Sequence, residues 1–244
     1  MKKLNLVRWI WLAFTVILIT LSAQSSNHVL TVKKGNYYQL VKMALMPSKD
    51  SKQQFDDYFT KLGPVIGESG AKIYSFGVTQ PGAGDGPAQM FLIAEYADST
   101  KPDIIFKSQD YLKNRNQRDK ALSYISQGFF LATEDGSFDL SQGELRLISL
   151  WPKEDKMAQL NAYFDLAVPD AIEKGAAVAP FVFVPDPART GQSYDAPMVM
   201  LAAWQNKKNE DSFYKGELFR NNVDKRNNAL NFLEEYHIVY FPEQ

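Results

Sequence analysis

Apolar positions in the first half of the chain switch between the period of a strand and that of a helix. Four runs of strand length are predicted, over residues 38–45, 72–78, 90–96 and 128–133. Between the first two, apolar residues recur at helical spacing, at Phe55, Phe59, Leu62 and Ile66. A second, broken helical region is predicted over residues 102–123. The order strand, helix, strand, strand, helix, strand is that of the split βαβ, or ferredoxin-like, unit.

The second half repeats this order. Its predicted strands cover residues 145–150, 177–184, 198–204 and 237–241, with a broken helical region over 209–233. Helical spacing returns at Leu160, Phe164, Ala167 and Ala171. Matching residues lie first 105 positions apart (Pro64 and Pro169, Gly70 and Gly175) and then 108 apart (Met90 and Met198, Arg118 and Arg226). Ordered matches at a fixed spacing predict that one unit was duplicated within the chain.

Proline and glycine punctuate the first helix of each predicted unit. Pro64 and Pro169 lie inside these helices, where proline removes a hydrogen bond and clashes with the preceding turn, so we expect a kink or a break. Gly70 and Gly175 are expected to end the helices in the left-handed conformation. Stretches rich in Gly and Pro predict hairpin loops over residues 81–87 and 185–197.

Two such units in tandem would cover each other's apolar sheet faces. A four-stranded ferredoxin-like sheet carries both helices on one face and leaves the other bare. The sequence therefore predicts an α+β fold in which two antiparallel sheets face each other as an intramolecular dimeric α/β-barrel. We expect a monomer with pseudo-twofold symmetry. The predicted boundaries are a first unit over 37–135, a linker over 136–143 and a second unit over 144–244.

The N-terminus is predicted to direct export. Three basic residues flank or precede an apolar run of 13 residues, from Trp9 to Leu21. Because this run is short for a membrane span, residues 1–25 are predicted to be a signal peptide that is removed, leaving an N-terminal extension over 26–36. We expect a periplasmic or secreted protein that meets the membrane only through this signal. An uncleaved N-terminal anchor is the alternative.

The charge balance argues against one class of partner. The chain carries a formal net charge of −1, and removing the three basic residues of the signal gives −4. Nucleic-acid binding is not expected, because it requires clustered Lys and Arg. The chain has no cysteine, so no disulfide is expected. No cofactor is predicted. The sequence also lacks a P-loop, a Gly-x-Ser-x-Gly elbow and a His-Glu-x-x-His helix.

Several short motifs in the first half carry a family resemblance. They are Pro64-x-x-Gly67-x-x-Gly70, the strand ending in Glu95-Tyr96, the run Ser108-Gln109-Asp110-Tyr111, and Arg118. In this respect residues 37–135 resemble the DUF1330 family of the dimeric α/β-barrel superfamily. The second half departs from the pattern, with Ala203, Gly216 and Phe219 in place of Glu95, Ser108 and Tyr111. The resemblance implies a fold shared by cofactor-independent monooxygenases, isomerases, haem enzymes and proteins of no known activity.

Glu95, with Arg118 and Tyr111 nearby, is the best candidate for catalysis. A carboxylate half-buried beside a cavity can have a raised pKa and act as a base. The competing interpretation, which we favour, is a structural ion pair between Glu95 and Arg118. Because the second half keeps Arg226 but has Ala203 in place of Glu95, the first half is the better place to look for a site.

Aromatic residues and one histidine are the candidates for ligand binding. Tyr96 and Trp204 end equivalent strands, and further aromatic residues lie on strands at Tyr38, Tyr74, Phe76, Trp151, Phe181 and Phe183. Side chains of this kind between the sheets would either line a slot for a flat apolar molecule or fill the core, which we favour. His237 in the last strand is the candidate axial ligand of a haem, whereas a packed strand residue is its more ordinary role.

Three functions follow from these observations. The first is an exported protein of unknown activity that binds a small apolar molecule between its sheets or in a sheet–helix pocket. The second is a cofactor-independent monooxygenase or isomerase that uses Glu95. The third is a haem-binding module that uses His237. The sequence names neither a ligand nor a reaction.

Overall fold

The computed structural model describes residues 29–81, 87–141, 143–184 and 196–241. The predicted signal peptide, His28 and most of the two predicted hairpin loops lie outside the described residues. Within the described ranges, no helix combines the length and the apolar character needed to cross a membrane.

The first half forms the predicted four strands and its helices. The strands are β2 (Tyr37–Leu45), β3 (Lys72–Pro81), β4 (Met90–Tyr96) and β5 (Leu122–Ala132), and the helices are α2 (Ser51–Ser69), α3 (Pro102–Phe106) and α4 (Gln109–Ala121). The strands pair antiparallel in the order β5-β2-β4-β3. The break between α3 and α4 was predicted, but β5 begins earlier than the strand predicted from residue 128.

The second half has the same arrangement. Its strands are β7 (Glu144–Pro152), β8 (Ala176–Phe183), β9 (Met198–Trp204) and β10 (Leu230–Phe241), and its helices are η1 (Glu154–Lys156), α5 (Met157–Glu173), α6 (Lys207–Tyr214) and α7 (Glu217–Ala229). Their order, β10-β7-β9-β8, repeats that of the first half strand for strand. The predicted fold class is confirmed, whereas an origin by gene duplication stays a prediction.

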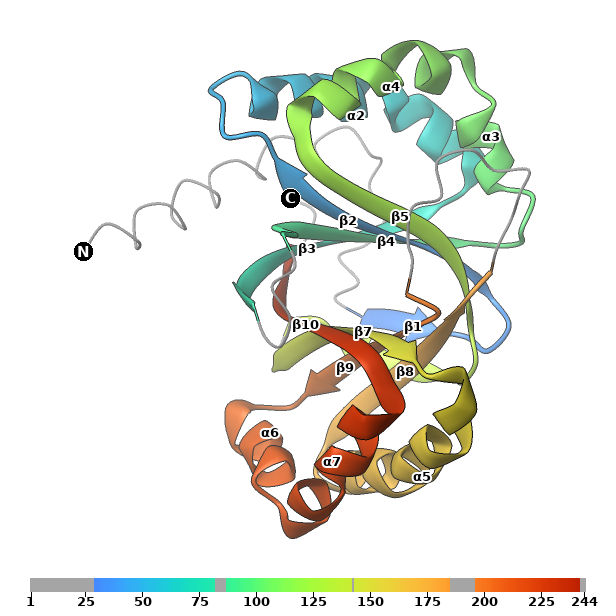
Figure 1. The fold of residues 1–244 in the computed structure, drawn as a ribbon. Coiled ribbons are helices and arrows are strands. Elements are labelled where there is room, and N and C mark those ends of the chain that lie inside the picture. Colours follow the sequence, from blue (N-terminus) through green and yellow to red (C-terminus); the bar gives the residue numbers. More distant parts are fainter. Residues whose placement is uncertain (1–28, 82–86, 142, 185–195, 242–244) are drawn as a thin grey trace.

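The two sheets join at their edges into one closed eight-stranded barrel. β3 pairs with β10, and β5 pairs with β8, so each half supplies four neighbouring strands. The helices lie outside the barrel, in one layer for each half (Figure 1). The two junctions differ in length: six residues of β10 pair with β3, but only three of β5, Phe130–Ala132, pair with β8. The predicted facing sheets are thus parts of a single continuous sheet.

Aromatic side chains from both halves fill the inside of the barrel. Tyr38 of β2 meets Phe181 of β8 edge-on with ring centroids 5.3 Å apart, and Phe91 of β4 meets Tyr236 of β10 at 4.9 Å. All four rings are buried in one hydrophobic cluster. Such pairs contribute about 0.5–1.5 kcal/mol each beyond the burial of their area. The space between the sheets is therefore core, as favoured above, and these side chains occupy it.

An ion pair lies within this core. Lys42 follows Tyr38 and Leu40 on the inward face of β2, and its ammonium group contacts Glu234 of β10. The Tyr236 hydroxyl donates a hydrogen bond of 2.6 Å to the other carboxylate oxygen. The side chains of Lys42 and Glu234 are only 2% and 6% exposed. The pair joins the two halves across the inside of the barrel.

The N-terminal extension and the linker pair with each other. β1 (Val29–Val32) and β6 (Gly136–Asp139) form a two-stranded antiparallel sheet. Leu30, Val32 and Phe138 are fully buried in the same cluster as the barrel interior. Two segments that the sequence marked only as connections therefore complete the core.

Neither internal proline breaks its helix. α2 continues through Pro64, and α5 continues through Pro169. Both prolines are exposed, so water can reach the carbonyl group that each leaves without a donor. Gly70 and Gly175 follow these helices with φ of 69° and 88°, which confirms the predicted left-handed ends.

Candidate functional site

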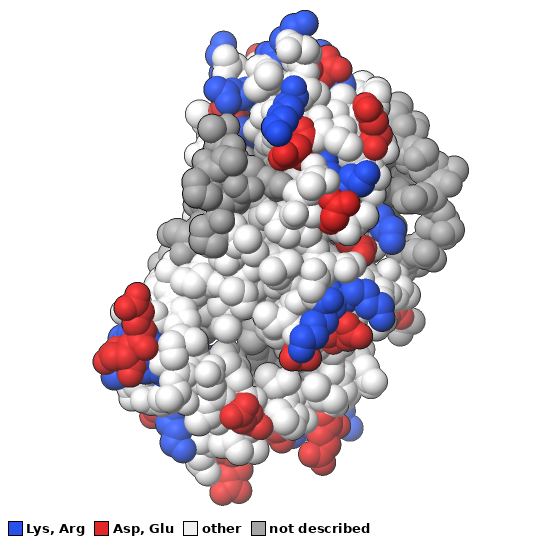
Figure 2. Space-filling model, turned by 90° about the vertical axis from the view of Figure 1, so that its right-hand side faces the viewer, with Lys and Arg blue, Asp and Glu red and all other residues white. Residues whose placement is uncertain are grey.

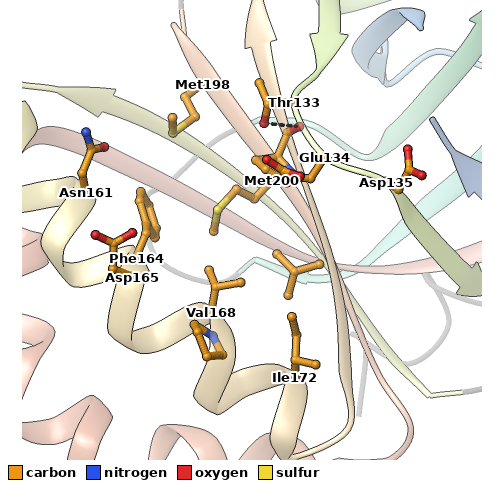
Figure 3. Close-up of a pocket in the computed structure, with 13 residues that line it drawn as sticks. Thr133, Glu134, Asp135, Asn161, Phe164, Asp165, Val168, Ile172, Met198 and Met200 are labelled. Atoms are coloured by element: carbon orange, nitrogen blue, oxygen red, sulfur yellow. Dashed lines mark hydrogen bonds between the residues drawn. The ribbon is translucent and has the colours of Figure 1, made fainter. Parts of the chain in front are cut away.

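A cleft opens on the outer face of the second half, between α5 and strands β8 and β9 (Figure 3). Its volume is about 640 Å³, within the range of pockets that hold small organic molecules. The residues that line it are Thr133, Glu134, Asp135, Asn161, Phe164, Asp165, Val168, Pro169, Ile172, Val178, Pro180, Met198 and Met200. It is a sheet–helix pocket of the kind that the sequence left open.

The position of the cleft follows from strand pairing. Pro180 of β8 has no N–H, and the ladder between β5 and β8 ends beside it. Thr133, the residue after β5, still donates its N–H to the Pro180 carbonyl over 3.0 Å, and the chain then leaves the barrel toward β6. The early end of this junction leaves the outer face of β8 and β9 open along α5.

One stripe of α5 forms a wall of the cleft. Phe164, Val168 and Ile172 follow each other at intervals of four residues and face the strands (Figure 3). The buried stripe of the same helix, Leu160, Tyr163, Ala167 and Ala171, packs on the sheet instead. Ile172 is 55% exposed, a high value for a large aliphatic side chain. The cleft thus presents apolar surface to solvent.

Two carboxylates of the cleft lie at its rim. Glu134 and Asp135 follow β5 and face two lysines, with Lys34 Nζ 3.5 Å from Glu134 and Lys33 Nζ 3.7 Å from Asp135. A hydrogen bond of 2.8 Å from the Lys34 backbone N–H holds the pKa of Asp135 below its ordinary value. These groups are exposed, so their ion pairs contribute little to stability.

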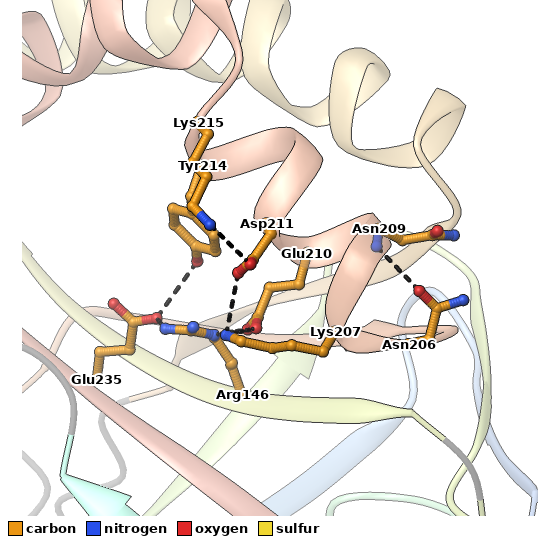
Figure 4. A network of polar contacts seen from close by, with 9 residues as sticks. All are labelled: Arg146, Asn206, Lys207, Asn209, Glu210, Asp211, Tyr214, Lys215 and Glu235. Carbon is orange, nitrogen blue, oxygen red and sulfur yellow. Dashed lines mark hydrogen bonds and ion pairs between the residues drawn. The ribbon is translucent and has the colours of Figure 1, made fainter.

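A second polar cluster lies beneath α6, on the outer face of the same half (Figure 4). Arg146 of β7 contacts Glu210 of α6 and Glu235 of β10. Its guanidinium group stacks on the ring of Tyr214, 4.7 Å from the centroid, and the Tyr214 hydroxyl donates to Glu235 over 3.3 Å. Lys207 pairs with the other oxygen of Glu210. The cluster fixes α6 to the sheet.

Charge in this cluster shifts its pKa values. Burial opposes ionisation of Glu210, but hydrogen bonds from Arg146 and Lys207 outweigh it and hold the pKa of Glu210 below its ordinary value. Burial, followed by the negative charge of Glu235, raises the pKa of Tyr214. These shifts keep Glu210 ionised and Tyr214 neutral at neutral pH. The cluster therefore has the character of a structural network.

The same positions in the first half carry neutral groups. Gln39 and Arg146 are equivalent, since they pair with Ala94 in β4 and Ala202 in β9. Gln127 occupies the position of Glu235, opposite β2. The Tyr96 hydroxyl donates a hydrogen bond of 3.0 Å to Gln39. An amide network in one half thus replaces an ionic network in the other.

The structure separates Glu95 from Arg118, so the predicted ion pair between them is wrong. Glu95 accepts a hydrogen bond of 3.3 Å from Asn36 and lies 3.8 Å from the Lys72 ammonium group. Arg118 pairs with the neighbouring Asp119 over 2.7 Å. The reason is strand alternation. Phe91 and Ile93 face the barrel interior, and Glu95 has the same parity, whereas α4 with Arg118 lies outside.

Arg118 and Tyr111 do lie together. The guanidinium group is 5.8 Å from the ring centroids of both Tyr111 and Tyr58, in cation–π geometry. Burial raises the pKa of Tyr58, and the nearby Arg118 only partly offsets this. Tyr111 is buried against Phe106, with centroids 4.9 Å apart. The contact holds α4 against α2.

The three candidates for ligand binding, Tyr96, Trp204 and His237, lie away from the cleft. Tyr96 and Trp204 are buried beneath the helices and do not face between the sheets. His237 is half-buried on β10, opposite Arg146. Burial, and then the positive charge of Arg146, lower the pKa of His237. None of the three lines the cleft. Within the described ranges, no group of three or more His, Cys, Asp or Glu side chains is arranged to hold a metal ion.

Sequence reasoning missed the cleft, although the repeat contained a sign of it. Val168 and Ile172 stand where the first half has Gly63 and Gly67, 105 positions earlier. Large aliphatic residues that replace glycine on one helix face suggest that this face acquired a contact. The described cleft accordingly lies in the second half, not in the first half that we expected to hold a site.

No protein-family model matches the chain, and no curated protein matches it in sequence. The resemblance to DUF1330 therefore stays a prediction. Solved structures do match the fold. An anthrone oxidase-like protein superposes with a TM-score of 0.56 at 7% identity, over 88% of this chain and 96% of that one.

Two further structures match over similar lengths. A candidate monooxygenase from Fusobacterium nucleatum subsp. nucleatum has a TM-score of 0.54 at 7% identity, over 87% of this chain and 96% of that one. A mutant chlorite dismutase from Candidatus Nitrospira defluvii has a TM-score of 0.52 at 8% identity, over 85% and 92%. At such low identity the likeness concerns the fold alone. The chain therefore has the dimeric α/β-barrel fold, with two ferredoxin-like halves in one polypeptide.

Proposed function

We propose that this protein binds a small, largely apolar molecule in the cleft between α5 and strands β8 and β9. The cleft itself carries the proposal, because its volume of about 640 Å³ and its aliphatic, aromatic and thioether lining are those of a small-molecule site. The barrel interior, the other place considered, is occupied by the side chains of the core.

Ile172 gives the clearest energetic reason for a ligand here. Full burial of an isoleucine side chain is worth about 1.5–3 kcal/mol relative to exposure. A ligand that covered the exposed 55% of Ile172 would gain on the order of 1 kcal/mol from this residue alone. Val168 and Met200 lie half-buried along the same cleft and would add to this gain.

Binding of Nile red, an uncharged dye whose fluorescence rises in apolar surroundings, tests the proposal. Ile172→Glu should weaken dye binding about tenfold, which corresponds to about 1.4 kcal/mol. Leu166→Glu is the matched control, since Leu166 lies on α5, is 47% exposed and does not line the cleft. Equal effects of the two variants, or no binding by the unmodified protein, would refute the assignment.

Export of the protein is part of the proposal. The basic, apolar and small-residue pattern of residues 1–25 supports it. The intact mass of protein recovered outside the cytoplasm should correspond to a chain that begins near residue 26. A mass that includes residues 1–25 would favour the uncleaved anchor instead.

The enzyme alternative has its support in the neighbours that carry the monooxygenase and oxidase names. Its candidate base, Glu95, is held by Asn36 and Lys72 and does not line the described cleft. A small-molecule binding site is therefore the better supported function. Oxygen uptake with apolar phenols that is lost in Glu95→Gln would reverse this order.

A further inference from the structure

The polar groups of the cleft define the class of ligand, an inference that rests on the proposed function. Three carboxylates belong to its lining, on Glu134, Asp135 and Asp165, whereas none of the described lining residues is Lys, Arg or His. Two of these acids already face lysines at the rim. Asp165 on α5 is different, because it forms no hydrogen bond or ion pair with any described residue.

The helix sequence explains why Asp165 has no lysine partner within α5. Asp103, Asp170 and Asp211 each pair with a lysine four residues later, at the residue that follows the helix. The residue four positions after Asp165 is Pro169, which has neither a cationic side chain nor an N–H group. The Asp165 carbonyl therefore also lacks its usual intrahelical donor. The cleft wall thus presents a carboxylate without a partner among the described residues.

Neighbouring side chains favour a cation at the same place. The Phe164 ring lies beside Asp165 in the cleft (Figure 3), and the face of an aromatic ring attracts organic cations. Met198 and Met200 supply polarisable thioether groups from the opposite wall. Val168 and Ile172 extend the cleft along α5 with apolar surface only. The arrangement suits a molecule with a charged head and an apolar body.

We propose that the cleft binds an organic cation, a protonated amine with an apolar body. The ammonium group lies against Asp165 and donates a hydrogen bond to its carboxylate. The apolar body covers Val168 and Ile172. Because the described lining residues offer acceptors and no basic side chain, an apolar carboxylate of the same size is disfavoured.

Three fluorescent probes that share a naphthalene ring system and differ in their polar group test the preference for a cation. These are 1-naphthylmethylamine, 1-naphthylmethanol and the carboxylate of 1-naphthaleneacetic acid. Each is titrated at pH 7 and low ionic strength, and binding is followed by fluorescence anisotropy. The amine should bind about two- to fivefold more tightly than the alcohol, the size expected of a partly exposed ion pair, and the carboxylate should bind most weakly. Asp165→Asn should remove the advantage of the amine over the alcohol.

Asp224→Asn is the matched control, since Asp224 is an exposed acid on α7 outside the cleft. An equal effect of both variants would show attraction by the overall negative charge and overturn the inference. Binding of the alcohol with no advantage for the amine would also overturn it, while the proposed function would stand. Failure of all three probes and of Nile red would refute both.

Discussion

Replacing Lys42 by Met should destabilise the protein strongly, because Glu234 would then lie inside the barrel without its cation. The two side chains are 2% and 6% exposed, so water cannot replace the lost partner. Removing one member of a buried ion pair costs about 3–5 kcal/mol. At about 2–4 °C per kcal/mol for a chain of this size, Tm should fall by roughly 6–20 °C.

The double variant Lys42→Met/Glu234→Gln separates the free energy of the contact between the two side chains from the separate effects of the two substitutions. A glutamine at position 234 is uncharged and keeps an oxygen that can accept the hydrogen bond from Tyr236. The double variant should therefore be less destabilised than the sum of the single variants. We expect a coupling free energy of about 2–3 kcal/mol, at the upper end of measured values for residues in contact.

Urea unfolding followed by tryptophan fluorescence measures these free energies. Trp151 is a suitable reporter, since the Lys42 ammonium group lies 5.8 Å from its ring centroid. The same cycle on the exposed pair of Lys107 and Asp103 should give less than about 1 kcal/mol. A coupling between positions 42 and 234 below about 0.5 kcal/mol would refute the contact between these two side chains.

Three further variants probe the second half and its connections. Arg146→Met leaves the buried Glu235 without its cation and Glu210 with only the exposed Lys207, and should cost about 3–5 kcal/mol in urea unfolding, whereas loss of Lys207 should cost about 1 kcal/mol or less. Gly143→Ala should cost at least about 2 kcal/mol more than Gly35→Ala, because both have positive φ but only the first would place a Cβ 1.8 Å from a backbone oxygen; equal costs would contradict this. His237→Phe should reduce the loss of stability on acidification below pH 6.5: the folded state lowers the pKa of His237, so the unfolded chain binds the proton first and acid favours unfolding. Unchanged pH dependence of Tm between pH 7 and pH 5 would refute that account.

Local periodicity made much of the fold predictable. The helical spacing around Phe59 and Phe164, and the strands that flank each helix, depend on neighbouring residues, and the structure contains both helices. The strand order within each half follows from the ferredoxin-like unit. The pairing of β1 with β6 was not predictable, because its partners are about 100 residues apart and neither has a marked pattern.

The errors concern side-chain direction and partners distant in sequence. The expected pair of Glu95 and Arg118 ignored the alternation along β4, which turns Glu95 to the face opposite the helices. Lys42 and Glu234 are separated by 192 positions, so no local pattern could join them. The apolar stripe of α5 was visible in the sequence, but its exposure depends on where the β5–β8 ladder ends.

The two halves share a topology but differ in what they place on it. On the face shown in Figure 2, charged side chains lie at both ends and along one side, and the centre of the face is largely uncharged. Beneath the helices, the second half has Arg146 and Glu235 where the first has Gln39 and Gln127. A buried ionic network of this kind adds little net stability compared with apolar packing, but it fixes the geometry of the groups that it joins. It fixes α6 to the sheet on one side of the second half, while α5 on the other side forms the cleft. Such a division suits a half that holds a ligand against a rigid frame.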